Sequence, residues 1–229
     1  MVTVVVSVSA GASLLRWVAW SFLVLVGGAT GCAETEIAVK TPARATVSPG
    51  SHRGEGRVIV MLRPFADKRT EQSCGMTKSG YNTEMGKILC AEDPTVALAH
   101  LIAVELAASG FKVLGDEKRA GPSTIVLSGS LTRLFVEPKR GFFSGSIETD
   151  IELDLRARTR DGLTANRTFY VKGDNAVVTT SKENVQQSFD SGVRQLLTAV
   201  VGAVANLVDN VPAPPAVARS SPPPTVVAP

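Results

Sequence analysis

The sequence contains few of the residues that carry out acid–base or metal chemistry. Among its 229 residues there are two histidines, His52 and His100, and three cysteines. Histidine is the side chain that general acid–base catalysis uses most often. The serine-nucleophile pattern Gly-x-Ser-x-Gly is also missing, because residues 141–145 have the wrong spacing. Gly54-Glu55-Gly56 does not fit a dinucleotide-binding loop, because it precedes the expected strand and such a loop follows one. We therefore expect no enzymatic activity, no cofactor and no bound metal.

The chain also lacks a block of charge of one sign. It has 24 Lys and Arg against 21 Asp and Glu, which gives a formal net charge of +3, and these residues are spread along the sequence. Proteins that bind nucleic acids cluster their Lys and Arg on one face or along one helix. The sequence therefore predicts no nucleic-acid partner.

The first 32 residues contain a single charged side chain, Arg16. An apolar run, Trp17–Val26, follows it and gives way to the small residues Gly27–Gly31. A positive charge, an apolar stretch of about 7–15 residues and small residues at the cut make a secretion signal. The run is shorter than the about 20 residues of a transmembrane helix. We predict a signal peptide over residues 1–31, with a retained N-terminal anchor as the alternative.

The segment ends in Ala29-Thr30-Gly31-Cys32, which resembles the bacterial lipobox. The resemblance implies that Cys32 receives a diacylglycerol and becomes the N-terminus of a membrane-anchored protein. Ala29 stands where lipoboxes usually carry leucine, and secretion with cleavage after Ala33 is the competing possibility. Ala33, in place of aspartate, follows the cysteine, and by resemblance to Gram-negative lipoproteins this implies the outer membrane, facing the periplasm.

Composition divides the remaining chain into three parts. Residues 32–56 are rich in Thr, Ala, Pro, Gly and Ser and predict a flexible tether, while residues 211–229 predict a disordered Pro-rich tail. Residues 57–210 are long enough for one globular domain. Cys74 and Cys90 remain as an even pair in an oxidising compartment, and we predict a disulfide between them.

Hydrophobic periodicity within residues 57–210 predicts two helices and about four to five strands. One helix begins at Asp93, before Pro94, and ends at Gly110; the other opens with a capping box at Thr180–Glu183. Small residues late in the second helix, Ala199 and Gly202 among them, would let a neighbour approach closely. We predict an α+β fold, a two-layer sandwich with a mostly antiparallel sheet and both helices on one face. The expected strands are 57–63, 111–114, 123–136 with a bulge near Thr132 or Arg133, 147–158 and 163–172, and residues 65–91 are expected to be a long loop.

The strand at 147–158 alternates apolar residues with a row of charged ones. Its acidic members are Glu148, Asp150, Glu152 and Asp154. Side chains along a strand lie in a row and do not converge as a Ca²⁺ site requires. We interpret the row as a solvated face.

The segment Val58–Arg69 has the pattern V-x-V-x-x-x-P-F-x-D-x-R. The chain resembles the YajG family of uncharacterised bacterial lipoproteins over roughly residues 57–208. The features that carry this resemblance are the segment Val58–Arg69, the helix end at Ser109–Val113, the three-strand meander and the closing helix. The insertion from Cys74 to Cys90 and the Pro-rich tail depart from the family pattern. The resemblance implies an envelope location and a fold, and no activity.

Two places are candidates for contact with a ligand or partner. Asp67 and Arg69 follow the first strand, where they form either a binding site or a local turn cap with an ion pair. The second place is the hairpin tip at residues 137–143, where two cations stand beside two aromatics that suit a lipid headgroup or a partner groove, or else fold over the sheet end. The tip residues concerned are Lys139, Arg140, Phe142 and Phe143.

From these features we predict a non-enzymatic, lipid-anchored periplasmic protein that binds or scaffolds another envelope protein or lipid. The alternative is an auxiliary lipoprotein of a lipid or lipopolysaccharide transport system that handles lipid directly. An apolar pocket between the sheet and the helices would favour the alternative, and a dry two-layer core would oppose it.

Overall fold

The computed structural model describes most of the predicted globular domain, in a compact unit that begins at Glu36. The described residues are 36–42, 58–79, 81–119, 121, 124–140, 145–159, 162–177 and 180–209. The predicted signal peptide, Cys32, His52, Phe142, Phe143, the Arg140 side chain and the Pro-rich tail lie outside them.

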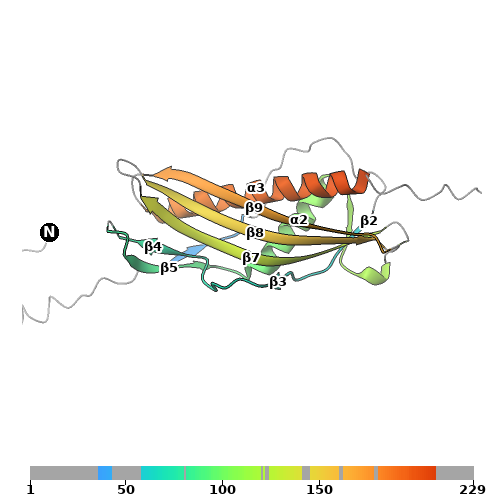
Figure 1. Ribbon diagram of the computed structural model, residues 1–229, viewed down its shortest axis with the longest axis horizontal. Helices are drawn as coiled ribbons and strands as arrows, with labels where there is room; N and C mark the ends of the chain where they lie inside the picture. The colour runs from blue at the N-terminus through green and yellow to red at the C-terminus, as the bar shows by residue number, and fades with distance from the viewer. Residues whose placement is uncertain are drawn as a thin grey trace, which may run out of the picture. The chain divides into compact units, whose positions relative to one another are not determined.

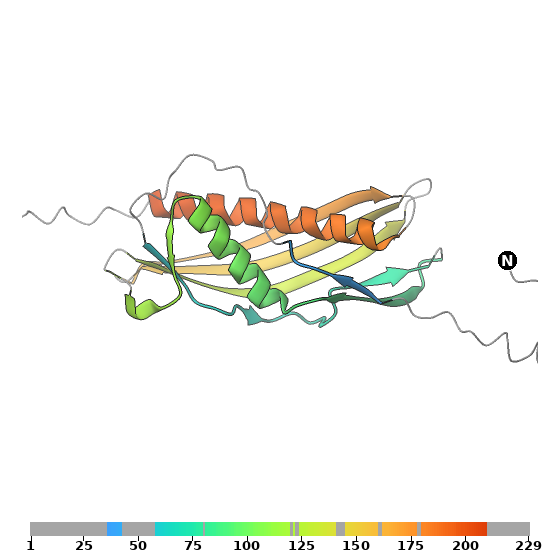
Figure 2. The ribbon, with the colours of Figure 1, turned by 180° about the vertical axis from the view of Figure 1, so that it is seen from behind.

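These residues form one mixed sheet of nine strands, with two helices on one of its faces (Figures 1 and 2). The α+β class is confirmed, but the expectation of four to five mostly antiparallel strands is wrong. No helix in the described part of the chain is long and apolar enough to cross a membrane. In chain order the elements are β1 (Ile37–Val39), β2 (Val58–Met61), β3 (Ala66–Asp67), β4 (Gly75–Lys78), β5 (Glu84–Cys90), α2 (Pro94–Ala108), β6 (Lys112–Leu114), the 3₁₀ turn η1 (Glu117–Arg119), β7 (Ile125–Arg140), β8 (Gly145–Thr159), β9 (Thr164–Val177) and α3 (Lys182–Asp209).

The sheet is built around β7, its longest strand. On one edge of β7 the strands β2, β3 and β4 follow one another, all parallel to it, and β8 pairs antiparallel with the other edge. β6 extends the sheet beyond β2, β5 and then β1 extend it beyond β4, and β9 lies beyond β8. The register of β7 on β8 shifts between Leu131 and Arg133, which confirms the predicted bulge.

Short strands account for the error in strand number. Residues 37–39, inside the segment predicted to be a flexible tether, pair with β5 instead and bury Ile37 and Val39. The predicted loop at 65–91 contains β3 and the hairpin of β4 and β5. β1, β3 and β4 have two to four residues each and show too little periodicity to be recognised in a sequence. β5 has seven residues, but apolar Met85 and Leu89 stand on its exposed side, so its sequence lacks a clear alternation of apolar and polar residues.

A disulfide joins Cys74, just before β4, to Cys90 at the end of β5, with 5.5 Å between the two Cα atoms. The predicted disulfide is therefore confirmed. It connects the two strands of the hairpin where they enter the sheet, and the Cys74 side chain is buried in the core.

Both helices begin and end close to the predicted positions. The Asp93 carboxylate accepts hydrogen bonds from the backbone N–H groups of Thr95 and Val96, and Gly110 adopts a φ of 87° after the last turn of α2. Ser181 caps α3 by accepting a hydrogen bond from Asn184 N, one residue later than the predicted capping box. The apolar stripe of α3 from Val185 to Val204 is buried against the sheet, as its period of 3.6 predicts.

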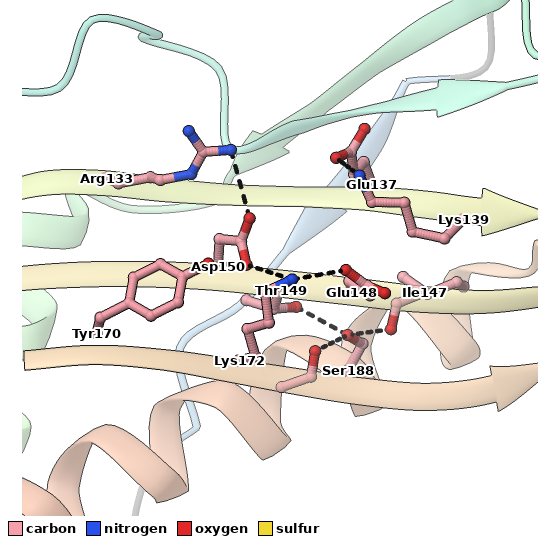
Figure 3. Close-up of polar contacts among 11 residues, drawn as sticks. Arg133, Glu137, Lys139, Ile147, Glu148, Thr149, Asp150, Tyr170, Lys172 and Ser188 are labelled. Carbon is pink, nitrogen blue, oxygen red and sulfur yellow. Dashed lines mark hydrogen bonds and ion pairs between the residues drawn. The ribbon is translucent and has the colours of Figure 1, made fainter.

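The helix α3 approaches the sheet most closely at a pair of glycines. A Cβ atom on Gly173 of β9 would lie 2.3 Å from the backbone nitrogen of Gly192 and 2.4 Å from the carbonyl oxygen of Ser188. Beside this contact, the buried hydroxyl of Ser188 lies 2.8 Å from Thr149 Oγ1 and donates to the carbonyl of Ile147 (Figure 3). Gly202, where close approach was also expected, has no neighbour within 4 Å.

Candidate binding surface

The face of the β7–β8–β9 meander that points away from the helices is a candidate binding surface (Figure 1). We call it the open face. Alternate residues of β8 point to the two sides, so that Ile147, Ile151 and Leu153 are buried under the helices while the acidic row lies on the open face. The three strands have 16, 15 and 14 residues, which makes this face long.

Asp150 is the centre of a polar network on the open face (Figure 3). Arg133 Nη2 donates to Asp150 Oδ2 at 3.3 Å, and the Tyr170 hydroxyl donates to Oδ1 at 3.1 Å. Lys172 Nζ lies 3.8 Å from Oδ1 and donates to Glu148 Oε2 at 3.2 Å. Asp150 is only 8 % exposed. Glu148 and Asp150 are therefore paired with cations of the neighbouring strands, and at these two positions the expectation of a solvated face is corrected.

This pairing changes the ionisation of the partners. Burial and the hydrogen bond to the Asp150 carboxylate both raise the pKa of Tyr170. The hydrogen bond to Glu148, followed by the charge of Asp150, raises the pKa of Lys172. Within the described residues, no group of three acidic, histidine or cysteine side chains is arranged to hold a metal ion.

The predicted contact residue Lys139 lies at the end of β7 and bonds to Glu137 (Figure 3). Glu137 also accepts a hydrogen bond from Lys78 Nζ at 3.0 Å. Burial acts to raise the pKa of Glu137, but the hydrogen bonds from Lys139 and Lys78 outweigh it and the pKa is lowered. The rest of the predicted tip, from the Arg140 side chain to Phe143, falls outside the described residues.

Asp67 and Arg69 form a local ion pair. Arg69 Nε and Nη2 donate to the two carboxylate oxygens of Asp67 at 3.0 and 2.9 Å, and the backbone N–H of Arg69 donates to Oδ1. The hydrogen bond from the Arg69 side chain lowers the pKa of Asp67. Arg69 is buried beside the disulfide, with Nη1 3.6 Å from Cys74 Sγ. This geometry favours the structural role of the pair over a binding role.

Arg69 nevertheless reaches the edge of the open face. It lines a hollow of about 250 Å³ together with Arg133 and Phe135 of β7 and with Thr70 and Glu71. The structure thus brings a sequence-predicted candidate next to the network around Asp150. No local pattern in the sequence indicates this proximity, because Arg69 and Arg133 are some 60 residues apart.

A second hollow of about 410 Å³ lies further along the open face. Lys68 and Arg156 line it, and neither makes an ion pair within the described part of the chain. Ser128 and Ser130 add small polar side chains, and Thr168 donates to Asp154 Oδ1 at 2.6 Å. We call this hollow the basin. Sequence reasoning missed it because it is assembled from β7, β8, β9 and the segment after β3.

An apolar crevice of about 240 Å³ opens on the helix side, between the meander and the C-terminal half of α3. Leu127, Leu155 and Phe169 of the sheet line it, with Val204 and Leu207 of α3. Its volume is below the about 300–1,000 Å³ of ordinary small-molecule pockets. The described core around it is packed with apolar side chains.

Solved structures of two other bacterial proteins resemble this chain to different degrees. Protein XCC0632 from Xanthomonas campestris, of family DUF330, is 18 % identical, with 76 % of this chain and 98 % of that chain covered at a TM-score of 0.50. A minor lipoprotein from Acinetobacter baumannii is 12 % identical, with 65 % and 93 % covered at a TM-score of 0.38. At 18 % identity the likeness to XCC0632 concerns the fold alone.

Comparison at the level of sequence families is more decisive. No curated protein matches the chain. A family described as "Uncharacterized lipoprotein" matches residues 46–202, which is well over half of the chain. This range includes the segment Val58–Arg69 and most of the closing helix α3, two of the features on which the resemblance to the YajG family was based. The protein therefore belongs to this family of YajG-like uncharacterized lipoproteins.

Proposed function

We propose that the protein is a non-enzymatic, lipid-anchored envelope protein whose open face binds another envelope component. In this proposal residues 1–31 are removed as a signal peptide, and Cys32 carries the lipid that holds the domain at the outer membrane, facing the periplasm. The observation that carries the binding role is the open face itself: both helices lie on the other side of the sheet (Figure 2), and the open face has two hollows.

The chemistry of the open face supports a polar partner. Side chains in the Asp150 network satisfy one another, so a partner gains little by competing with them. Lys68 and Arg156 at the basin make no ion pair within the described residues and are available to an anionic group. Ser128 and Ser130 supply hydroxyl groups beside them. We expect the partner to present carboxylate or phosphate groups to the basin.

Two positions weigh against catalysis. His100 is exposed on α2, on the helix side of the sheet. The buried Ser188 bonds to Thr149 and to the backbone of Ile147 and not to a histidine. A Ser–His–acid arrangement around His100 is therefore not formed by these residues.

In-cell photo-crosslinking tests the binding role. A photoreactive residue at Asn166 or Tyr170 on the open face should give a discrete adduct with an envelope component. The matched control is Val96, which is 49 % exposed on the helix layer and should give none. A third probe at Phe142 tests the predicted hairpin tip. Adducts from Val96 alone, or from no position, would argue against binding by the open face.

The anchor is tested separately, by mass spectrometry of the mature protein and by metabolic labelling with palmitate. We expect a lipid-modified N-terminus at Cys32 and no label on the Cys32→Ser variant. An unmodified N-terminus at Glu34 would instead support cleavage after Ala33.

The alternative, direct handling of lipid, is favoured only by the apolar crevice beside α3. Its small volume and the packed core around it make it less suitable for a lipid chain than a closed cavity would be. Native mass spectrometry of the purified protein would detect a co-purified lipid. If a lipid is found, Ala203→Trp, which fills the crevice, should remove it.

A further inference from the structure

The position of β1 restricts how the domain sits on a membrane. We propose that the end of the sheet at the β4–β5 turn rests on the lipid surface that anchors Cys32, with Tyr81 and Met85 in the headgroup layer. We call this end the turn end and define it by Ser79, Tyr81–Met85 and Lys139. The inference rests on the proposed lipidation of Cys32.

The first step concerns the length of chain between the anchor and the sheet. β1 begins at Ile37, so only the four residues Ala33–Glu36 separate it from Cys32. A fully extended chain spans at most about 3.3–3.6 Å per residue, which places Cys32 within about 18 Å of Ile37. The tether expected from composition, residues 32–56, has several times as many residues as this link. The domain is therefore held against the membrane surface.

The second step is the direction in which the chain enters the sheet. β1 runs parallel to β5 with Ile37 opposite Ile88, so β1 starts on the side of the sheet where Glu84 and the turn end lie. From Ile88 to Glu84 the strand covers about 13 Å. This is less than the about 18 Å that the link allows, so a lipid on Cys32 can reach the level of the turn end. β4 and β7 run parallel, with Gly75 paired to Val136, so Lys139 lies at this same end (Figure 1).

The third step is the side chains that the turn end presents. Tyr81 is 96 % exposed and Met85 is 51 % exposed. The backbone beneath them is fixed, because Ser79 N donates to the Thr83 carbonyl at 2.8 Å and Ser79 Oγ accepts from Tyr81 N and Thr83 N. Asn82 completes the turn with a φ of 62°. Tyrosine is enriched at membrane–water interfaces, where the ring meets apolar groups and the hydroxyl meets water.

Among the described side chains near this end, the charges do not add up to a strongly cationic surface. Lys78 and Lys139 share Glu137, and the exposed residues Glu36 and Glu84 offset Lys87. We therefore expect an apolar contact that persists on neutral lipid and at high salt.

The opposite end of the sheet provides a matched comparison. Leu163, 59 % exposed, follows β8 at the turn into β9. The 15 residues of β8 place it about 50 Å from the turn end. With the turn end on the membrane, Leu163 at the far turn stays in water, and so does Tyr170 on the open face. The open face therefore stays accessible to its partner.

The test uses the full mature protein with its lipid intact, reconstituted in phosphatidylcholine vesicles. A polarity-sensitive fluorophore is attached in turn through Tyr81→Cys, Leu163→Cys and Tyr170→Cys, since Cys74 and Cys90 are already bonded. We expect a blue shift and quenching by lipid-borne quenchers at position 81 only, unchanged in high salt. In the Cys32→Ser background, Tyr81→Ser should weaken vesicle partitioning roughly tenfold, the loss expected for one apolar side chain.

The outcomes separate this inference from the anchor. Quenching at positions 163 and 170 would mean that the domain lies flat on the membrane. Quenching at none of the three positions, on protein that is bound to the vesicles, would mean that the turn end stays in water. Either result would overturn the proposed orientation and leave the lipid anchor at Cys32 untouched. A protein that lacks lipid at Cys32 and stays off the vesicles would overturn the anchor, and the orientation with it.

Discussion

The contact between Gly173 and Gly192 provides the sharpest test of how the helix layer is held. In Gly173→Ala the new methyl group would lie 2.3–2.4 Å from backbone atoms of α3, where ordinary contacts begin near 3.4 Å. Backbone atoms cannot rotate away as a side chain can. The helix must therefore move by roughly 1 Å, or the strand must bend by as much.

The magnitude follows from two contributions. Overpacking in a core costs about 1–3 kcal/mol, and the rigid backbone puts this site at the upper end. Moving α3 also stretches the hydrogen bonds of Ser188 to Thr149 and Ile147, each worth about 0.5–1.5 kcal/mol. We expect Gly173→Ala to lower the free energy of unfolding by about 3–5 kcal/mol, a large part of the 5–15 kcal/mol typical of a domain.

Urea unfolding of the non-acylated Cys32→Ser protein measures this change. Gly202→Ala is the matched control, because it makes the same substitution on α3 where no atom lies within 4 Å. Alanine is a better helix former than glycine by about 1 kcal/mol, so the control should be as stable as the parent or slightly more. If Gly173→Ala unfolds within about 0.5 kcal/mol of the parent, the spread of ordinary surface substitutions, the close contact does not hold the layers together.

Further predictions concern the disulfide, the cap of α2 and the Asp150 network. Cys90→Ser, which removes the bond to Cys74, should lower the free energy of unfolding by about 3 kcal/mol, and equal urea midpoints for oxidised and reduced protein would contradict this. The hydrogen bond from Thr95 lowers the pKa of Asp93, so the ionised Asp93 carboxylate stabilises the folded protein. This stabilisation is fully present above the ordinary aspartate pKa and is lost as the pH falls through the pKa of Asp93 in the folded state. Asp93→Asn, which keeps the cap, should therefore remove that part of the acid sensitivity in pH-dependent urea titrations, whereas an unchanged pH profile would exclude it. Burial and the Asp150 carboxylate raise the pKa of Tyr170, so Asp150→Asn should let Tyr170 ionise at lower pH in an ultraviolet titration.

Local signals predicted the long elements of this protein well. The cap at Asp93, the terminator at Gly110 and the 3.6-residue stripe of α3 act within a few residues, so the sequence contains all that is needed to recognise them. The alternation in β8 and the phase change at the β7 bulge are equally local. The pairing of Cys74 with Cys90 followed from the count of cysteines.

The short strands could not be predicted, because they form only by pairing with segments far apart in the sequence. β1, β3 and β4 have two to four residues each, and they are strands because β5 and β7 offer them backbone hydrogen bonds. For this reason a segment with the composition of a tether contributes β1 to the sheet. The same pairing shortens the link to Cys32 and gives the turn end its proposed place on the membrane.

The candidate surface divides in the same way. The alternation of residues 147–158 by itself placed the acidic row on the outer side of the sheet, because successive side chains of a strand point to opposite faces. Only the tertiary structure brought Arg133 and Lys172 to Asp150, since these contacts depend on strand register. It also placed Lys68 and Arg156, which are about 90 residues apart in the sequence, on the lining of the same basin. The sequence thus determined the class of protein and its long elements, and the folded chain decided which side chains meet on each exposed surface, because those meetings depend on strand register.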